Sequence, residues 1–146
     1  MSPISSHGEA CLGYLREGYA AWQNPRGTGW AFAVRVEHRL GLSLEEGIAC
    51  FDRLTQLGLI QPYPGPNLMG TYRLTLKGVA FMEMLPWLEE AARSLFSVID
   101  ADPDLGDEEK EQARAGLWSE ALEAAFTLSL GWAIEHLPDL WKERKR

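Results

Sequence analysis

The chain of 146 residues has a hydrophobic fraction of 46% and a formal net charge of −7. This length suits one domain or a small domain with an appendage, and this hydrophobic fraction excludes a mostly disordered chain. The charge is uneven, because residues 1–80 sum to +1 and residues 81–146 sum to −8. Nucleic-acid-binding proteins normally gain affinity from clustered positive charge, so this balance argues against binding that relies on phosphate contacts.

The sequence predicts a cytoplasmic protein that has no membrane segment. The longest nearly apolar run, residues 124–134, is too short to span a bilayer. The N-terminus lacks a basic and then apolar leader, so we expect no secretory signal. Cys11 and Cys50 lie in apolar contexts. These contexts favour reduced core thiols, although a disulfide between them is not excluded by the sequence.

The N-terminal part of the chain predicts two helices with a short strand between them. Ser6 and Glu9 fit a capping box that opens a helix ending near Gln23. Apolar residues recur along this helix at helical spacing, so one of its faces is expected in the core. Residues 30–32 favour a short strand, and residues 33–40 favour a second helix.

A third helix is marked at both ends. Ser43 is a good N-cap, and Glu46, three residues later, is its reciprocal partner. The helix runs to about Leu57, and Gly58 ends it in the usual glycine position. Two strands follow, at residues 59–63 and 71–75, with a tip at residues 64–70.

The C-terminal part predicts long helices. Thr75 caps a fourth helix, which Pro86 breaks or kinks before it continues to Ile99. Asp107 opens a last helix that Pro138 ends, and residues 141–146 read as a basic, frayed tail. Two apolar stripes lie on opposite sides of this last helix: Leu117, Ala121, Ala124, Leu128 and Trp132, and Trp118, Leu122, Phe126 and Leu130. A helix that is apolar on two sides is buried on two sides, so we expect it to form a homodimer.

Two stretches together indicate a family. Residues 39–60 read RLGLSLEEGIACFDRLTQLGLI, and residues 72–78 read YRLTLKG. Between Ala33 and Met82 the chain resembles the winged helix-turn-helix of MarR- and PadR-type transcription regulators. The resemblance implies a mainly α, α+β fold, in which residues 1–83 form a helix-turn-helix with a two-stranded wing. Residues 84–146 would then be an acidic helical segment that makes the dimer or binds a partner.

Two positions depart from the packing of that family. Gly47 stands where the family usually has a β-branched core residue, and Glu37 stands where a small Ala is common. A glycine inside a helix costs about 1 kcal/mol relative to alanine. The two departures predict an altered crossing of the second and third helices.

The outward face of the third helix lacks the charge of a DNA-reading helix. Relatives that read DNA often carry Arg or Lys near the positions of Ala49 and Asp52, which here are apolar and acidic. The helix N-terminus is a natural seat for phosphate, yet it carries Glu45 and Glu46. Capping explains these acids, but it does not explain the missing cations on the helix and at the wing tip.

We therefore predict a regulatory protein that acts mainly by protein–protein contact, with weak or absent DNA binding. Its partner would be a protein, for example transcription or nucleic-acid-handling machinery. The predicted contact patch has an apolar centre and a polar rim, as protein interfaces do. Its residues are Glu45, Ile48, Ala49, Asp52, Arg53, Gln56, Leu68 and Met69. Alternatively, Ile48 is core, and Leu68 and Met69 fold back onto Tyr63 or Tyr72.

The second hypothesis is an ordinary DNA-binding repressor whose cations gather only in space. They would be Arg26, Arg35, Arg39, Arg53, Arg73 and Lys77. A third hypothesis, an enzyme or small-ligand binder, has little support. No nucleophile elbow, glycine-rich phosphate loop or acid–base arrangement is recognisable, so we expect no catalytic residues and no cofactor.

Metal binding is also not expected. Four acidic residues fall at positions 1, 3, 5 and 12 of the calcium-loop template: Asp100, Asp102, Asp104 and Glu111. The template requires Gly at position 6, where the chain has Leu105, so a solvated acidic linker is the preferred interpretation. The histidines at positions 7, 38 and 136 are far apart and are expected to be surface or capping residues.

Overall fold

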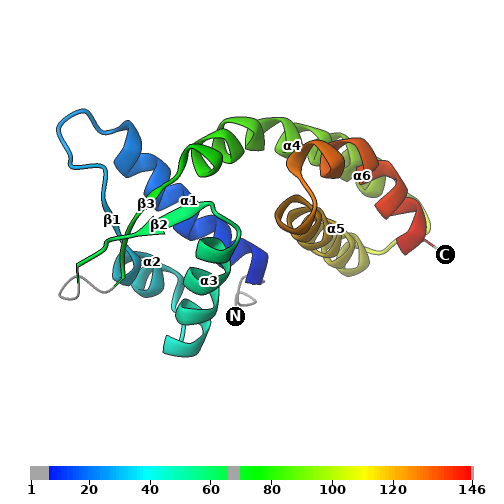
Figure 1. Cartoon of the computed structure of the whole chain (residues 1–146). Helices are drawn as coiled ribbons and strands as arrows, with labels where there is room; N and C mark the ends of the chain where they lie inside the picture. Colours follow the sequence, from blue (N-terminus) through cyan, green and yellow to red (C-terminus); the bar gives the residue numbers. More distant parts are fainter. Residues whose placement is uncertain (1–6, 66–69, 146) are drawn as a thin grey trace. The chain divides into compact units, whose positions relative to one another are not determined.

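The computed structural model describes residues 7–65 and 70–145, and it divides the chain into two compact units, Met1–Glu83 and Met84–Arg146. The described chain is mainly helical with a small antiparallel sheet (Figure 1). In chain order the elements are α1 (His7–Gln23), β1 (Ala31–Phe32), α2 (Ala33–Leu40), α3 (Leu44–Gln56), β2 (Ile60–Pro62), β3 (Thr71–Leu74), α4 (Leu76–Asp100), α5 (Asp107–Thr127) and α6 (Leu130–Arg144). The mainly α, α+β fold class is thereby confirmed.

The N-terminal unit contains a helix-turn-helix followed by a β-hairpin. The turn between α2 and α3 includes Gly41 at a φ of 65°, a backbone conformation that glycine adopts without strain. β2 and β3 form the hairpin, and β1 pairs with the other edge of β3 in the strand order β1-β3-β2. Ala31 lies opposite Tyr72, and Gln61 lies opposite Arg73. The short strand near residue 31 therefore adds a third strand to the two that the sequence predicts for the wing.

Local sequence sets both ends of α3. The Ser43 hydroxyl accepts a hydrogen bond from the Glu46 backbone N–H at 3.1 Å, and the Glu46 carboxylate accepts one from the Ser43 N–H at 3.1 Å. Hydrogen bonding of the Glu46 carboxylate to the Ser43 backbone N–H, and then to the Ser43 side chain, lowers the pKa of Glu46. Gly58, at a φ of 74°, follows the helix. The predicted capping box and glycine stop are both confirmed.

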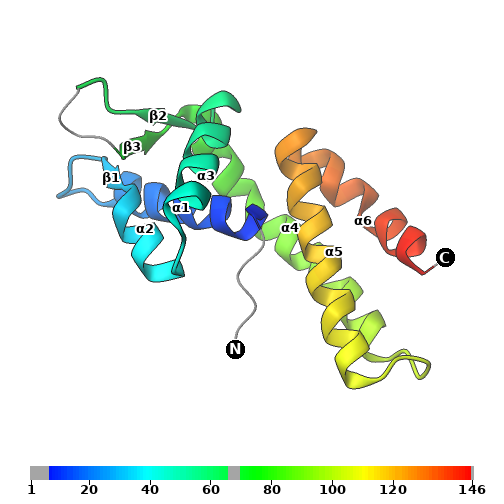
Figure 2. The same ribbon diagram turned by 90° about the horizontal axis from the view of Figure 1, so that it is seen from below.

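The core of this unit forms around α1, which packs against β3, α2 and α3 (Figure 2). Two glycines allow close approach. A Cβ at Gly13 would lie 2.7 Å from the Leu40 side chain, and one at Gly18 would lie 2.7 Å from Leu74. The Tyr72 hydroxyl donates to the backbone carbonyl of Tyr14 at 2.6 Å, which ties the sheet to the middle of α1.

Gly47 and Glu37, the two residues that depart from the family's packing, both contact the Tyr14 hydroxyl. The Tyr14 hydroxyl lies 3.2 Å from the Glu37 carboxylate and 3.4 Å from the Gly47 carbonyl, with both oxygens as acceptors. A Cβ at Gly47 would lie 3.0 Å from both the Glu37 carboxylate and the Tyr14 hydroxyl. The glycine therefore makes room for a polar contact between α1, α2 and α3.

α4 is one helix that contains Pro86, so this proline does not break it. Two predictions about the last helix are wrong. The predicted last helix is two helices, because α5 ends at Thr127 and α6 begins at Leu130. Ser129 starts the second helix, and its hydroxyl accepts a hydrogen bond from the Trp132 N–H at 3.0 Å. Pro138 lies inside α6 and does not end it.

α5 and α6 pack against each other, and parts of both predicted stripes are buried. The buried members are Leu117, Ala121, Leu122, Phe126 and Leu130. Leu128, at the bend between the helices, remains 61% exposed. Since the chain itself buries these five residues, they do not argue for a dimer through the last helix.

The basic tail is not a frayed end within the described residues. α6 extends to Arg144, whose guanidinium pairs with the Glu120 carboxylate at 2.5 Å. Lys145 pairs with Asp102 at 3.3 Å, and the nearby Trp141 is buried. None of the described helices is both long and apolar enough to cross a membrane.

Candidate partner-binding groove

A groove of about 540 Å³ lies between the helix-turn-helix and the hairpin of the N-terminal unit. α2 and α3 form one wall, and described residues of the hairpin at the end of β2 and the start of β3 form the other. Its lining residues are Ala33, Glu37, Leu44, Gly47, Ile48, Phe51, Asp52, Pro62, Tyr63, Gly65, Gly70 and Thr71.

Apolar side chains of α3 line this groove and remain in contact with solvent. Leu44 is 74% exposed and Ile48 is 52% exposed, one helical turn apart. Phe51 continues the stripe, and its ring meets Tyr72 edge-on at 5.7 Å between centroids, so it is partly core. A separate set of α3 residues, Gly47, Cys50 and Leu54, is buried. α3 thus has a second apolar stripe, whose members Leu44 and Ile48 are left exposed by the described residues of the unit.

The charges that line the groove are negative. Glu37 and Asp52 contribute carboxylates, and none of the described lining residues is basic. Beneath Glu37, burial and the neighbouring carboxylate raise the pKa of Tyr14, so its hydroxyl stays a hydrogen-bond donor. An apolar groove with an acidic rim suits an apolar ligand that carries positive charge.

The predicted patch is only partly in this groove. Ile48 and Asp52 line it, and the exposure of Ile48 shows that this residue is not core. Glu45, Ala49 and Gln56 are exposed and Arg53 is half-buried, but these four do not line it. Leu68 and Met69 lie outside the described residues.

Sequence reasoning missed Leu44, Phe51 and Tyr63 as groove residues. The signal was the spacing of Leu44, Ile48 and Phe51 at i, i+4 and i+7, which is typical of an apolar helix face. This spacing does not single out the groove, because the buried residues of α3 recur at helical spacing as well. Tyr63 lies in the hairpin, so the pattern of α3 does not reveal it.

Several cations that a repressor would need are engaged within the protein. Arg39 pairs with Glu17 at 3.6 Å, and the Lys77 ammonium donates to the Leu57 carbonyl at 2.8 Å. Lys77 thereby provides a hydrogen-bond donor for a backbone carbonyl at the C-terminal end of α3.

Two further arginines lie against aromatic rings. The Arg73 guanidinium lies 4.8 Å from the centre of the Trp30 ring and also donates to Gln61 at 3.1 Å. The Arg35 guanidinium lies 5.1 Å from the centre of the Phe32 ring. These contacts hold Arg73 of β3 and Arg35 of α2 against the protein's own rings, although both side chains stay exposed and charged.

The acidic loop residues do not gather around a common point. Asp100 pairs with Arg114, and Asp102 pairs with Lys145 at 3.3 Å. The Asp104 backbone N–H donates to the Asp102 carboxylate at 2.9 Å. The calcium-loop arrangement is absent among the described residues, and the carboxylates serve as ion-pair and turn partners.

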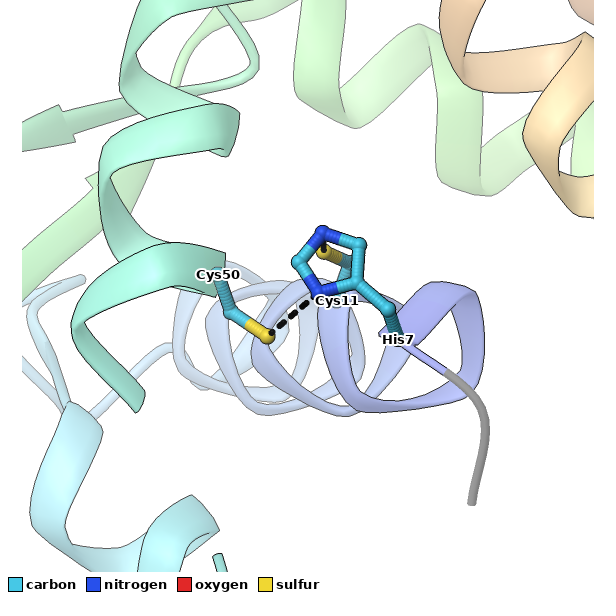
Figure 3. Close-up of side chains that lie close together, drawn as sticks. All are labelled: His7, Cys11 and Cys50. Atoms are coloured by element: carbon cyan, nitrogen blue, oxygen red, sulfur yellow. Dashed lines mark hydrogen bonds between the residues drawn. The ribbon is translucent and has the colours of Figure 1, made fainter. Parts of the chain in front are cut away.

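A second cluster combines two thiols and an imidazole (Figure 3). Cys11 and Cys50 are buried thiols, as the sequence predicts, and His7 lies exposed beside them. The Cys11 sulfur is 3.6 Å from Nε2 of His7, and the Cys50 sulfur is 3.7 Å from Nδ1 of the same ring. Hydrogen bonding with Cys11 lowers the pKa of the Cys50 thiol, against the effect of burial and the Glu46 charge.

Sequence reasoning missed this cluster, although part of the signal was present. His7 and Cys11 are four residues apart and therefore share one face of α1. Cys50 comes from α3, and only the packing of α1 against α3 brings it to the same place.

Comparison with known proteins adds no relative: no family model, curated protein or solved structure matches the chain.

Proposed function

We propose that the protein is a cytoplasmic, non-enzymatic regulator with a MarR/PadR-like winged helix that binds a protein partner in the groove between α3 and the hairpin. The observation that carries this proposal is the uncovered stripe of Leu44 and Ile48, 74% and 52% exposed, in a groove whose described lining has no cation. The buried thiols Cys11 and Cys50 suit a reducing compartment.

The chemistry of the groove defines the occupant. Leu44, Ile48 and Phe51 offer apolar contact, and Asp52 and Glu37 offer negative charge. A short segment of a partner protein with apolar residues next to a Lys or Arg matches both features. A DNA phosphate backbone matches neither, because it meets carboxylates where it needs cations.

We expect Leu44→Glu and Ile48→Glu each to weaken binding of such a segment about tenfold or more, the size of a modest interface hot spot. The probe is a peptide selected on the wild-type protein from a random display library, with affinity measured by fluorescence anisotropy. Leu76→Glu is the matched control, since Leu76 opens α4, is 86% exposed and does not line the groove. Melting temperatures should stay close to wild type for all three variants.

Two results would contradict this proposal. One is equal loss of peptide binding in Leu76→Glu and Leu44→Glu, which would indicate a nonspecific apolar contact. The other is sub-micromolar binding of labelled duplex DNA at low salt with a steep salt dependence, which would favour the repressor hypothesis.

We extend the proposal to a homodimer formed by the C-terminal unit through the outer side of α4. Trp87 and Val98 are 66% and 53% exposed, and their spacing puts them on one side of this helix. Tryptophan is enriched in protein interfaces. We expect light scattering to report a dimer and Trp87→Glu to shift it to monomer at an unchanged melting temperature. Trp22→Glu, at a tryptophan 49% exposed in the N-terminal unit, should remain dimeric; a wild-type monomer at high micromolar concentration contradicts the dimer.

A further inference from the structure

We propose that His7, Cys11 and Cys50 form a binding site for one zinc ion, with a water molecule as the fourth ligand. The site is separate from the groove, because none of the three residues lines it. The inference therefore does not rest on the proposed function.

The geometry fits zinc with little movement of the backbone. One ligand atom from each residue can be chosen so that all three lie within 4.8 Å of one another. Tetrahedral zinc with its usual bond lengths to sulfur and nitrogen holds its ligand atoms about 3.5–3.8 Å apart. Each sulfur already lies in this range from one ring nitrogen, Cys11 at 3.6 Å from Nε2 and Cys50 at 3.7 Å from Nδ1. A zinc ion takes only one of these nitrogens, so one sulfur–nitrogen distance, now within 4.8 Å, has to shorten by at most about 1 Å.

The chemistry of the donors selects the metal class. Two thiolates and an imidazole form a soft set, which favours zinc over calcium or magnesium, ions that prefer oxygen ligands. The two sulfurs are buried while His7 is exposed. Solvent therefore reaches the cluster from the side of His7, where the fourth, water-occupied position is expected.

Binding would connect two helices that the fold only packs together. His7 and Cys11 come from α1 and Cys50 comes from α3 (Figure 3), so the ion would crosslink the first turns of α1 to the middle of α3. A ligand that binds only the folded state stabilises it in proportion to the logarithm of its concentration. At a hundredfold excess over Kd, we expect the melting temperature of the N-terminal unit to rise by about 10–20 °C.

The test uses the full chain, reduced and stripped of metal, with Co²⁺ as a spectroscopic substitute for zinc. We expect one equivalent of Co²⁺ to give a thiolate-to-cobalt charge-transfer band, and zinc to displace it. Cys50→Ser and His7→Ala should each weaken binding by at least the roughly 10–100-fold that loss of an outer-shell partner costs. His38→Ala is the matched control, because His38 is an exposed histidine of α2 outside the cluster.

Cys50→Ser changes a buried residue and can prevent folding. His7→Ala changes an exposed residue, so it provides the test even if Cys50→Ser does not fold. A second measurement is alkylation of Cys11 and Cys50, which zinc should slow in wild type and not in His7→Ala. The proposal is overturned if saturating Co²⁺ gives no charge-transfer band with the reduced protein. It is also overturned if His38→Ala weakens binding as much as His7→Ala does.

Discussion

Gly78→Ala is expected to destabilise the N-terminal unit by roughly 3 kcal/mol, at the upper end of what overpacking costs. A Cβ at Gly78 would lie 2.1 Å from the backbone carbonyl oxygen of Leu59. This oxygen cannot move away cheaply, because it also accepts the Thr75 N–H at 3.1 Å. The Gly78 N–H donates to the Thr75 hydroxyl at 3.1 Å, so the clash disturbs the start of α4 as well.

The matched control is Gly131→Ala in α6, where the nearest atom to a new Cβ is the Ser129 hydroxyl at 3.9 Å. Alanine is the better helix former, so this change should be neutral or stabilising by up to about 1 kcal/mol. Hydrogen exchange followed by mass spectrometry distinguishes the two units, since two units need not unfold together. Gly78→Ala should lose protection within residues 7–83. If the free energy of exchange in Gly78→Ala stays within about 0.5 kcal/mol of wild type, Gly78 of α4 does not pack against the Leu59 carbonyl.

The elements that the sequence predicts best are those that a few neighbouring residues specify. The boundaries of α3 follow from Ser43, Glu46 and Gly58, each of which acts within four residues. The same holds for Thr75, whose hydroxyl accepts the Gly78 N–H as a helix cap does. In such places local propensity and the tertiary structure agree.

The errors arise where tertiary packing overrides the local pattern. Residues 107–138 read as one amphipathic helix, and only the packing of α5 on α6 makes a bend at Leu128 and Ser129 favourable. Pro138 is tolerated inside α6, where Leu137 and Trp141 are buried beside it. Periodicity describes which residues are buried, but it does not say which element buries them.

The candidate sites were harder to predict than the fold, because each joins distant segments. The groove combines α3 with Tyr63 of the hairpin, and the thiol cluster combines α1 with Cys50. The sequence alone predicts an unusual α3 surface, through its acids and missing cations. It does not say that Ile48 faces the hairpin, since that depends on where the wing packs.

Leu122→Glu is expected to unfold the C-terminal unit, at a cost of roughly 4 kcal/mol or more, whereas Leu128→Glu should change stability by less than about 0.5 kcal/mol. Leu122 is fully buried in α5, and Leu128 is 61% exposed at the bend before α6. The substitution is chemically the same in both variants, so the difference measures mainly burial, because it far exceeds what helix propensity contributes. Exchange protection in residues 107–144 is the readout.

The pH dependence makes this comparison sharper. A carboxyl group buried at position 122 would have a raised pKa, because burial disfavours its charged form. Leu122→Glu should therefore recover part of its lost stability as the pH falls toward 4 and the new carboxyl group is protonated, measured relative to wild type at each pH. Leu128→Glu, whose carboxylate stays in water, should follow wild type. Equal destabilisation of the two variants would instead favour one unbroken helix from Asp107 to Pro138 with both stripes covered by another molecule, and would restore the dimer that the sequence predicts for this segment.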